Sequence, residues 1–286
     1  MLKKPSLISK SSYRRISYPL ISVMVAAGLS VGTAFPSQAI PWRQLIFQGI
    51  QMISISNLSD RQEVELGKQI NQQLFRSKDV KLYRDRAANK YIDRIGQRLV
   101  AASPRSDIPY TFQVVEDDNI NAFATMGGFV YINTGLIKAA DNEAELASVI
   151  AHEIAHIAAR HGVKQLRQTL LAQGLATAGG VDDSVAVQIG VELVLRRPKS
   201  RQAEFEADQI GIETLGRSGY AQYGAITFMQ KLLKQASPPS FLSTHPATSA
   251  RISQMKQMIN PEFAYNGDGL NERRYQVIVN RLLPSR

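Results

Sequence analysis

The sequence has no cysteine among its 286 residues, which excludes disulfide bonds and thiolate metal sites. It also lacks a block of basic residues with interleaved aromatic side chains, the pattern typical of a nucleic-acid-binding surface. Five of its 34 lysines and arginines lie in residues 1–39, where there is no acidic residue. The remainder therefore carries 29 basic and 24 acidic residues, a net charge of +5 instead of +10. We expect no nucleic-acid partner.

Long apolar runs are missing from residues 163–199, although small and aliphatic side chains are frequent there. Charged residues interrupt every run well short of the roughly 20 residues that a membrane-spanning helix needs. We predict two helices joined near Gly179 and Gly180. Their apolar residues fit either a lid or a surface that touches a membrane.

Residues 1–39 have the order of features found in an export signal. Basic residues come first, an apolar stretch covers 20–35, and residues 37–39 supply small side chains for cleavage. An uncleaved anchor is the alternative, because the apolar stretch is close to a short transmembrane span. Both interpretations predict an exported protein of the periplasm or envelope, with residues 40–58 as a linker and membrane association left open.

The most informative stretch is 142–161, where apolar residues recur at helical spacing. Asp141 or Asn142 can cap the start of this helix, and Gly162 is expected to end it. Three of the four histidines of the chain lie in its last ten residues, at positions 152, 156 and 161. A buried helix with polar ligands on one face is predicted.

His152 and His156 are four residues apart, so on a helix both imidazoles leave the same face. This spacing suits two ligands of one zinc ion, and Glu153 beside the first ligand could take a proton from water. Histidines bonded to the backbone of a core helix are the alternative. The concentration of histidines beside a glutamate favours the metal site.

Catalytic zinc normally has a third protein ligand. The metzincin arrangement would need a histidine where Gly162 stands, so the ligand must come from elsewhere. Glu204 and Asp208 lie four residues apart at the start of another predicted helix. Glu204 could bind zinc, and Asp208 could accept the outer N–H of a ligand histidine. A solvated acidic helix face is the alternative.

Together, residues 143–156 (EAELASVIAHEIAH) and 200–208 (SRQAEFEAD) resemble zinc metallopeptidase family M48. These gluzincins are related to HtpX and to the CAAX prenyl proteases, and the sequence is most similar to the soluble periplasmic BepA-like members. The resemblance covers about residues 60–260. It implies one Zn²⁺ per chain held by His152, His156 and Glu204, with Glu153 as general base and Asp208 required for activity.

A small sheet is predicted before the zinc helix, because residues 110–116, 119–124 and 129–132 read as strands separated by acidic and glycine-rich turns. In zincin-type peptidases an edge strand pairs with the extended substrate backbone. The resemblance makes the substrate-binding candidates Asn121, Ala122, Phe123, Ala124, Gly127 and Gly128. A turn without a substrate role is the alternative.

The segment 243–252 contains His245 before Pro246, ordinarily a turn. It resembles the His-Pro element of BepA-like members, in which the histidine reaches the zinc and controls access. On that basis His245 and Arg251 are candidates for displacing water or for stabilising the tetrahedral intermediate. A purely structural turn is the alternative.

These observations predict an α+β, predominantly α, zincin-like metallopeptidase core with a small sheet next to the active-site helix. The domain would cover 59–262, followed by a tail at 263–286. The function expected is that of an exported zinc metalloendopeptidase, cutting unfolded or misassembled envelope proteins. A chaperone or scaffold with a gated zinc site is the alternative, and a prenyl-peptide processing enzyme is disfavoured because its barrel of membrane helices is absent from the sequence.

Overall fold

The structure is a computed structural model that describes residues 52–53, 58–175, 181–196, 199–235, 237, 239–246 and 249–284. The predicted export signal and most of the predicted linker lie outside these residues. No helix in the described ranges is long and apolar enough to cross a membrane.

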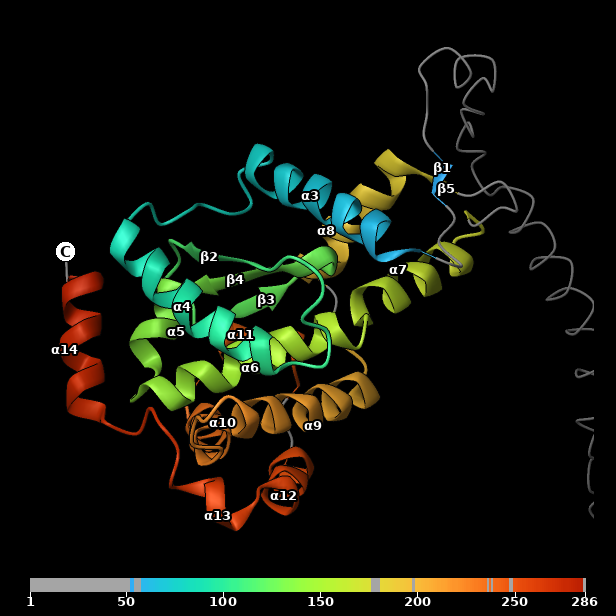
Figure 1. Ribbon diagram of the computed structural model, residues 1–286. Coiled ribbons are helices and arrows are strands. Elements are labelled where there is room, and N and C mark those ends of the chain that lie inside the picture. The colour runs from blue at the N-terminus through green and yellow to red at the C-terminus, as the bar shows by residue number, and fades with distance from the viewer. Residues whose placement is uncertain are drawn as a thin grey trace, which may run out of the picture. The chain divides into compact units, whose positions relative to one another are not determined.

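Helices dominate the fold, which is of the α+β class, as predicted (Figure 1). The α-helices are α3 (Asp60–Arg76), α4 (Arg86–Ala102), α5 (Thr134–Ala139), α6 (Glu143–Ala158), α7 (His161–Ala172), α8 (Asp183–Arg196), α9 (Arg201–Arg217), α10 (Tyr223–Leu233), α11 (Ser240–Thr244), α12 (Ser249–Met258), α13 (Pro261–Ala264) and α14 (Glu272–Leu282). The strands are β1 (Met52–Ile53), β2 (Thr111–Val115), β3 (Ala122–Ala124), β4 (Phe129–Asn133) and β5 (Val181–Asp182), and a short 3₁₀ turn, η2, covers Met126–Gly128.

The main sheet has the strand order β2-β4-β3, with β4 parallel to β2 and antiparallel to β3. All five residues of β4 are buried, because helices cover both faces of this central strand. Val130 and Ile132 belong to the core shared with α4, α6 and α10, whereas Phe129 and Tyr131 belong to a second core with α3, α7 and α8. The sheet thus separates two apolar clusters, with α3 and α8 on one side and α6 on the other (Figure 1).

The helix predicted across 142–161 is divided in the structure. Asn142 caps α6 by accepting the N–H of Glu145 at 3.0 Å, as predicted, but α6 ends at Ala158. Arg160, with a φ of 56°, takes the left-handed conformation, and α7 starts at His161. The expectation that Gly162 ends the helix was wrong, since Gly162 lies inside α7.

The segment 163–199 contains helices on both sides of the predicted joint, α7 and α8, and the joint itself lies outside the described residues. The two-residue strand β5 precedes α8 and pairs with β1, a pairing that the sequence did not predict. Residues of the predicted tail form α14, whose Tyr275 and Val279 are buried in the first core. The Tyr275 hydroxyl donates to the carbonyl of Ile137 at 2.7 Å, which joins α14 to α5.

Candidate active site

Helices α6 and α9 pack against each other and bring the two sequence motifs together. Gly211 of α9 lies at this contact, where an added Cβ would come within 3.4 Å, an ordinary van der Waals distance, of the backbone of His152. His152, His156, Glu204 and His245 are all buried, and each offers a ligand atom within 4.8 Å of the others. The three residues predicted as zinc ligands therefore converge, and His245 joins them.

The donor spacing fits a zinc ion. His152 Nε2 and His156 Nε2 are 3.1 Å apart, and the two oxygens of Glu204 lie 3.5 Å from His152 Nε2 and 3.4 Å from His156 Nε2. Ligand atoms about 2.0–2.1 Å from a tetrahedral zinc are separated from one another by about 3.3 Å. Two imidazoles and one carboxylate are also a donor set that zinc prefers.

Glu153 lies beside these ligands and is fully buried. Neither of its carboxylate oxygens accepts a hydrogen bond within the described residues, and His245 Nε2 lies 3.4 Å from its Oε1. Burial raises the pKa of Glu153 above its ordinary value. A carboxylate with free lone pairs and a raised pKa is suited to accept a proton from water.

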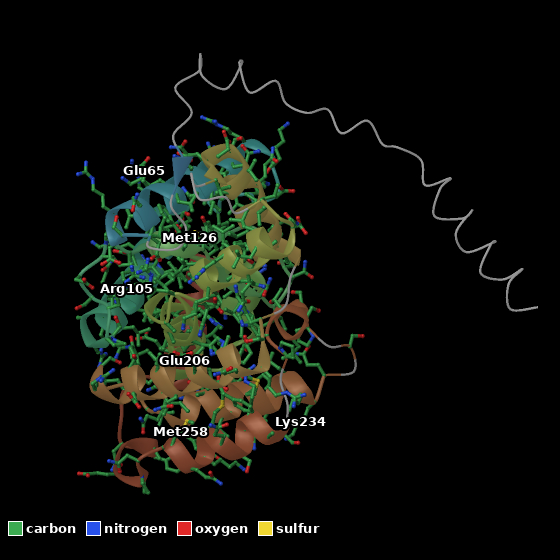
Figure 2. The ribbon with its side chains drawn as sticks, turned by 90° about the vertical axis from the view of Figure 1, so that its right-hand side faces the viewer. Glu65, Arg105, Met126, Glu206, Lys234 and Met258 are labelled. Atoms are coloured by element: carbon green, nitrogen blue, oxygen red, sulfur yellow. The ribbon has the colours of Figure 1, made fainter. Side chains whose placement is uncertain are left out.

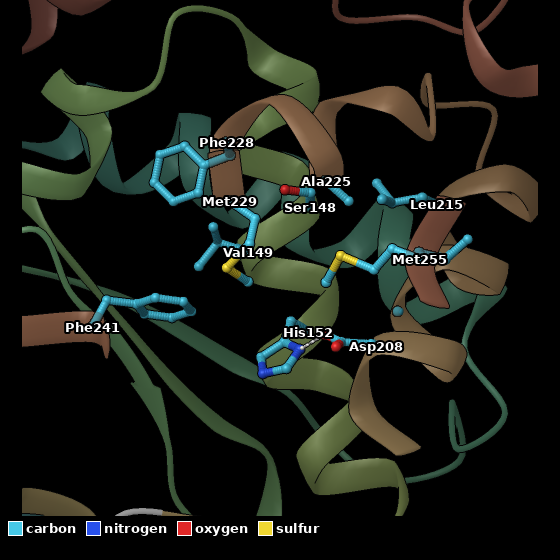
Figure 3. A pocket seen from close by; sticks show the side chains of 12 residues that line it. Ser148, Val149, His152, Asp208, Leu215, Ala225, Phe228, Met229, Phe241 and Met255 are labelled. Carbon is cyan, nitrogen blue, oxygen red and sulfur yellow. Dashed lines mark ion pairs between the residues drawn. The ribbon is translucent and has the colours of Figure 1, made fainter. Parts of the chain in front are cut away.

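Asp208 lies one turn after Glu204 on α9, with its Oδ1 3.1 Å from His152 Nδ1 (Figure 3). The carboxylate therefore faces the outer nitrogen of a ligand histidine, the position suggested by its spacing. The same close-up shows apolar side chains, among them Phe241 and Met255, around a small cavity of about 30 Å³ next to His152.

Arg251 is fully buried, and its guanidinium group contacts two acidic residues. Its Nε and Nη2 form a bidentate pair with Asp208 at 2.6 and 2.7 Å, and its Nη1 lies 2.7 Å from Glu204 Oε2. Nη1 also donates to the carbonyl of Pro246 at 3.1 Å. Arg251 thereby ties the His245-Pro246 turn to both acidic residues of α9.

His245 places its Nδ1 3.1 Å from Glu204 Oε1 and 3.3 Å from His152 Nε2. Its ring is stacked on Phe241, with the ring centroids 4.7 Å apart. Its backbone N–H donates to the Phe241 carbonyl at 2.9 Å. The side chain thus lies where a fourth ligand or a substrate atom would be found.

The charges of the ligands depend on one another. Burial by itself lowers the pKa of His152, but hydrogen bonds to Asp208 and Glu204 raise it to about 9. Burial lowers the pKa of His156 well below its ordinary value. For Glu204, burial is outweighed by hydrogen bonds to the histidines, which lower its pKa.

The predicted substrate-binding residues surround an edge of the sheet. Strand β3 pairs with β4 alone, and its Phe123 is stacked on Tyr131 with centroids 4.5 Å apart. Ala122 is buried, whereas Asn121 and Ala124 are partly exposed. A substrate role for these residues stays a prediction.

The two glycines of the following turn have a packing role. Both have positive φ, 76° for Gly127 and 96° for Gly128. A Cβ on Gly127 would lie 2.6 Å from the Glu63 carbonyl oxygen, and one on Gly128 would lie 2.0 Å from that of Pro109. The turn can therefore approach α3 at Gly127 and the segment before β2 at Gly128 this closely only because these two residues lack side chains.

The sequence interpretation gave no role to three residues that the structure brings to the site. His161 contacts the outer nitrogen of His156, and Glu206 contacts His161 in turn. Lys199 is the third, because it lines a small cavity with Ala124 and His156. Burial lowers the pKa of Lys199, against the influence of Glu153 and Glu204. The cluster of histidines in the sequence was the only signal for His161.

A helix with two histidines four residues apart, a glutamate after the first and a carboxylate donor from a second helix define the metal site of a zincin-type metallopeptidase. A family model described as peptidase family M48 matches residues 86–259, and the chain belongs to that family.

The chain is 32% identical over 265 residues to the beta-barrel assembly-enhancing protease of Escherichia coli K12, covering 87% of this chain and 53% of that protein. The protein of the same name from Yersinia pestis is 31% identical over 265 residues, covering 84% and 52%. The mitochondrial metalloendopeptidase OMA1 of Schizosaccharomyces pombe is 28% identical over 176 residues, covering 59% and 52%. The chain thus spans about half the length of the curated relatives it matches.

Proposed function

We propose that the chain is an exported zinc metalloendopeptidase that hydrolyses peptide bonds in unfolded or misassembled envelope proteins. The observation that carries the proposal is the convergence of His152, His156 and Glu204 at tetrahedral donor distances, with the buried Glu153 carboxylate beside them. Two of the most similar relatives are named as proteases of beta-barrel assembly, which supports an envelope substrate. The basic and apolar order of residues 1–39 supports export.

The chemistry follows from the protein groups around the site. His152, His156 and Glu204 would hold the zinc, which when bound supplies Lewis-acid activation of water and of the scissile carbonyl. Glu153 takes the proton of the attacking water and passes it to the leaving nitrogen. Asp208 orients His152 through its Nδ1, and Arg251 orients Asp208. An extended substrate would pair with the open side of β3, so that recognition rests on main-chain hydrogen bonds.

The test is degradation of casein, an unfolded protein, by the purified protein loaded with zinc. Glu153→Gln at equal zinc content is expected to lose about 10²–10⁴-fold in rate, because it removes the general base and leaves the ligands in place. Glu213→Gln changes an exposed acid on α9 and is the matched control, expected to cut like the wild type. Equal rates for Glu153→Gln and the wild type would contradict the assignment.

A gated site with a chaperone-like role is the second candidate, and the position of His245 among the ligand atoms favours it. In that case the wild type cuts slowly, His245→Ala cuts faster, and suppression of client aggregation survives Glu153→Gln. The same casein assay, run beside a light-scattering aggregation assay, separates the two functions.

A further inference from the structure

His156 and His152 are the two histidines of one helix, but their outer nitrogens meet different partners. The outer nitrogen of His152 faces the carboxylate of Asp208. The outer nitrogen of His156, Nδ1, lies 2.7 Å from Nδ1 of His161. The group that contacts Nδ1 of His156 determines which of its two nitrogens carries the proton. Since that group is His161, another histidine, the tautomer of His161 must in turn be determined by its own partner.

Glu206 supplies that outer contact. It belongs to α9 (Figure 2), and its Oε2 lies 3.1 Å from Nε2 of His161. The His161 side chain is only 5% exposed, whereas that of Glu206 is 44% exposed. Lys164 lies 3.9 Å from the same carboxylate oxygen. The row of contacts from His156 through His161 to Glu206 therefore leads from the buried site to a polar cavity of about 350 Å³. This cavity is lined by His161, Lys164 and Glu206.

The direction of the hydrogen bonds follows from what each group can do. A carboxylate only accepts, so the N–H of a neutral His161 is on Nε2, pointing at Glu206. His161 Nδ1 then carries a lone pair and accepts the N–H of His156 Nδ1. His156 is left with its lone pair on Nε2, the nitrogen that lies among the ligand atoms. In the opposite tautomer His156 could not offer Nε2 to a metal.

The backbone conformation just before His161 brings its side chain to His156. On a continuous helix His161 would stand five residues after His156 and about 140° around the axis from it. The left-handed Arg160 interrupts the helix after α6, so that His161 begins α7 and its ring lies 4.9 Å from that of His156. We propose that His161, held by Glu206, is a positioning residue that fixes His156 with its Nε2 lone pair toward the metal.

The role assigned to His161 rests on the proposed zinc site, and zinc affinity tests it directly. The full-length protein would be titrated with Zn²⁺ in competition with a chromogenic chelator, and the metal-free unfolding midpoint would be followed by circular dichroism. His161→Phe keeps an aromatic ring and removes both nitrogens. It is expected to weaken zinc binding about 10–100-fold, the usual cost of losing such a contact.

Three further variants separate positioning from packing. His161→Asn retains an oxygen acceptor near the place of Nδ1 and is expected to bind zinc within about threefold of the wild type, as the acceptor is what matters. Glu206→Leu removes the outer contact and is expected to weaken binding less than His161→Phe does. Arg167→Ala, which changes an exposed residue of α7 outside this row of groups, is the control expected to leave affinity unchanged. If His161→Phe fails to fold, His161→Asn and Glu206→Leu still carry the test.

The proposal is overturned if His161→Phe binds zinc as the wild type does, or if His161→Phe and His161→Asn lose affinity equally, which would indicate ring packing alone. A wild-type protein that binds zinc without cutting casein contradicts the proposed function, and the affinity ratios still decide the role of His161. A wild-type protein that binds no zinc overturns both.

Discussion

At the scale of single residues, Arg251 shows how the site tolerates its acidic groups. Glu204 and Asp208 are buried four residues apart on one helix, and two carboxylates in such surroundings repel each other and lose hydration. The guanidinium of Arg251 meets both of them and the turn that carries His245. Arg251 thus holds both acidic residues of α9 and the His245-Pro246 turn together at the metal site.

We expect Arg251→Met to lower the free energy of unfolding of the metal-free protein by about 3–5 kcal/mol, the usual cost of leaving a buried charge without its partner. The measurement is urea denaturation followed by circular dichroism. Lys138→Met is the matched control, since Lys138 pairs at 3.0 Å with Asp118 where both side chains are largely exposed. That pair should be worth only about 0–1 kcal/mol. Equal losses in the two variants would refute this account of Arg251.

Much of the site could be predicted at the residue scale, because ligand geometry leaves a local signature. The spacing of His152 and His156 is set by the helical repeat, and so is that of Glu204 and Asp208. The role of His161 could not be predicted. It depends on the left-handed Arg160, and the sequence gives no local reason for a non-glycine residue to adopt that conformation there.

At the scale of elements, the helices were predictable and the sheet order was not. Apolar periodicity and a capping residue located the start of α6, and a helix was also predicted where α9 begins, because these signals are local. The parallel pairing of β2 with β4, and the position of β3 at the edge, depend on how helices cover both faces of the sheet. That arrangement is decided by contacts between residues far apart in the sequence, so the strand pattern alone could not give it.

The turn between β3 and β4 makes a prediction of its own. Gly127 and Gly174 both have positive φ, 76° and 67°. A Cβ added to Gly127 would lie 2.6 Å from the Glu63 carbonyl oxygen, whereas one added to Gly174 would meet open space. Alanine at either position carries the left-handed backbone cost of about 1–2 kcal/mol. Gly127→Ala should cost a further 1–3 kcal/mol or so, because α3 would have to move.

Urea denaturation of the two glycine variants gives the comparison. If Gly127→Ala and Gly174→Ala lose the same stability, the close approach of the turn to Glu63 is not a constraint. A larger loss for Gly127→Ala identifies the turn as the place where α3 sets the position of the sheet edge.

At the scale of the whole molecule, the metal site lies between segments that are distant in the chain. Its donors come from α6, from α9 and from the turn after α11, so a bound cation would cross-link three parts of the fold. Binding that favours the folded state raises the free energy of unfolding by RT ln(1 + [L]/Kd).

We therefore expect free zinc at 100 times its Kd to stabilise the protein by about 2.7 kcal/mol, and a chelator to reverse the effect. The readout is the thermal unfolding midpoint with and without zinc. Glu204→Gln should abolish most of the shift, because it removes one ligand, whereas Glu213→Gln should retain it. A wild-type thermal unfolding midpoint that is the same with and without zinc would contradict the assigned ligands.

All four histidines of the chain, His152, His156, His161 and His245, lie in one site. Every imidazole resonance in a nuclear magnetic resonance spectrum of the protein therefore originates there, without background from the surface. Selective ¹⁵N labelling of the histidine rings would give two nitrogen signals from each of the four rings, and the tautomer, metal contacts and solvent exchange of each ring could be followed separately. The sequence thus provides a complete set of spectroscopic reporters at its chemical centre, and none elsewhere.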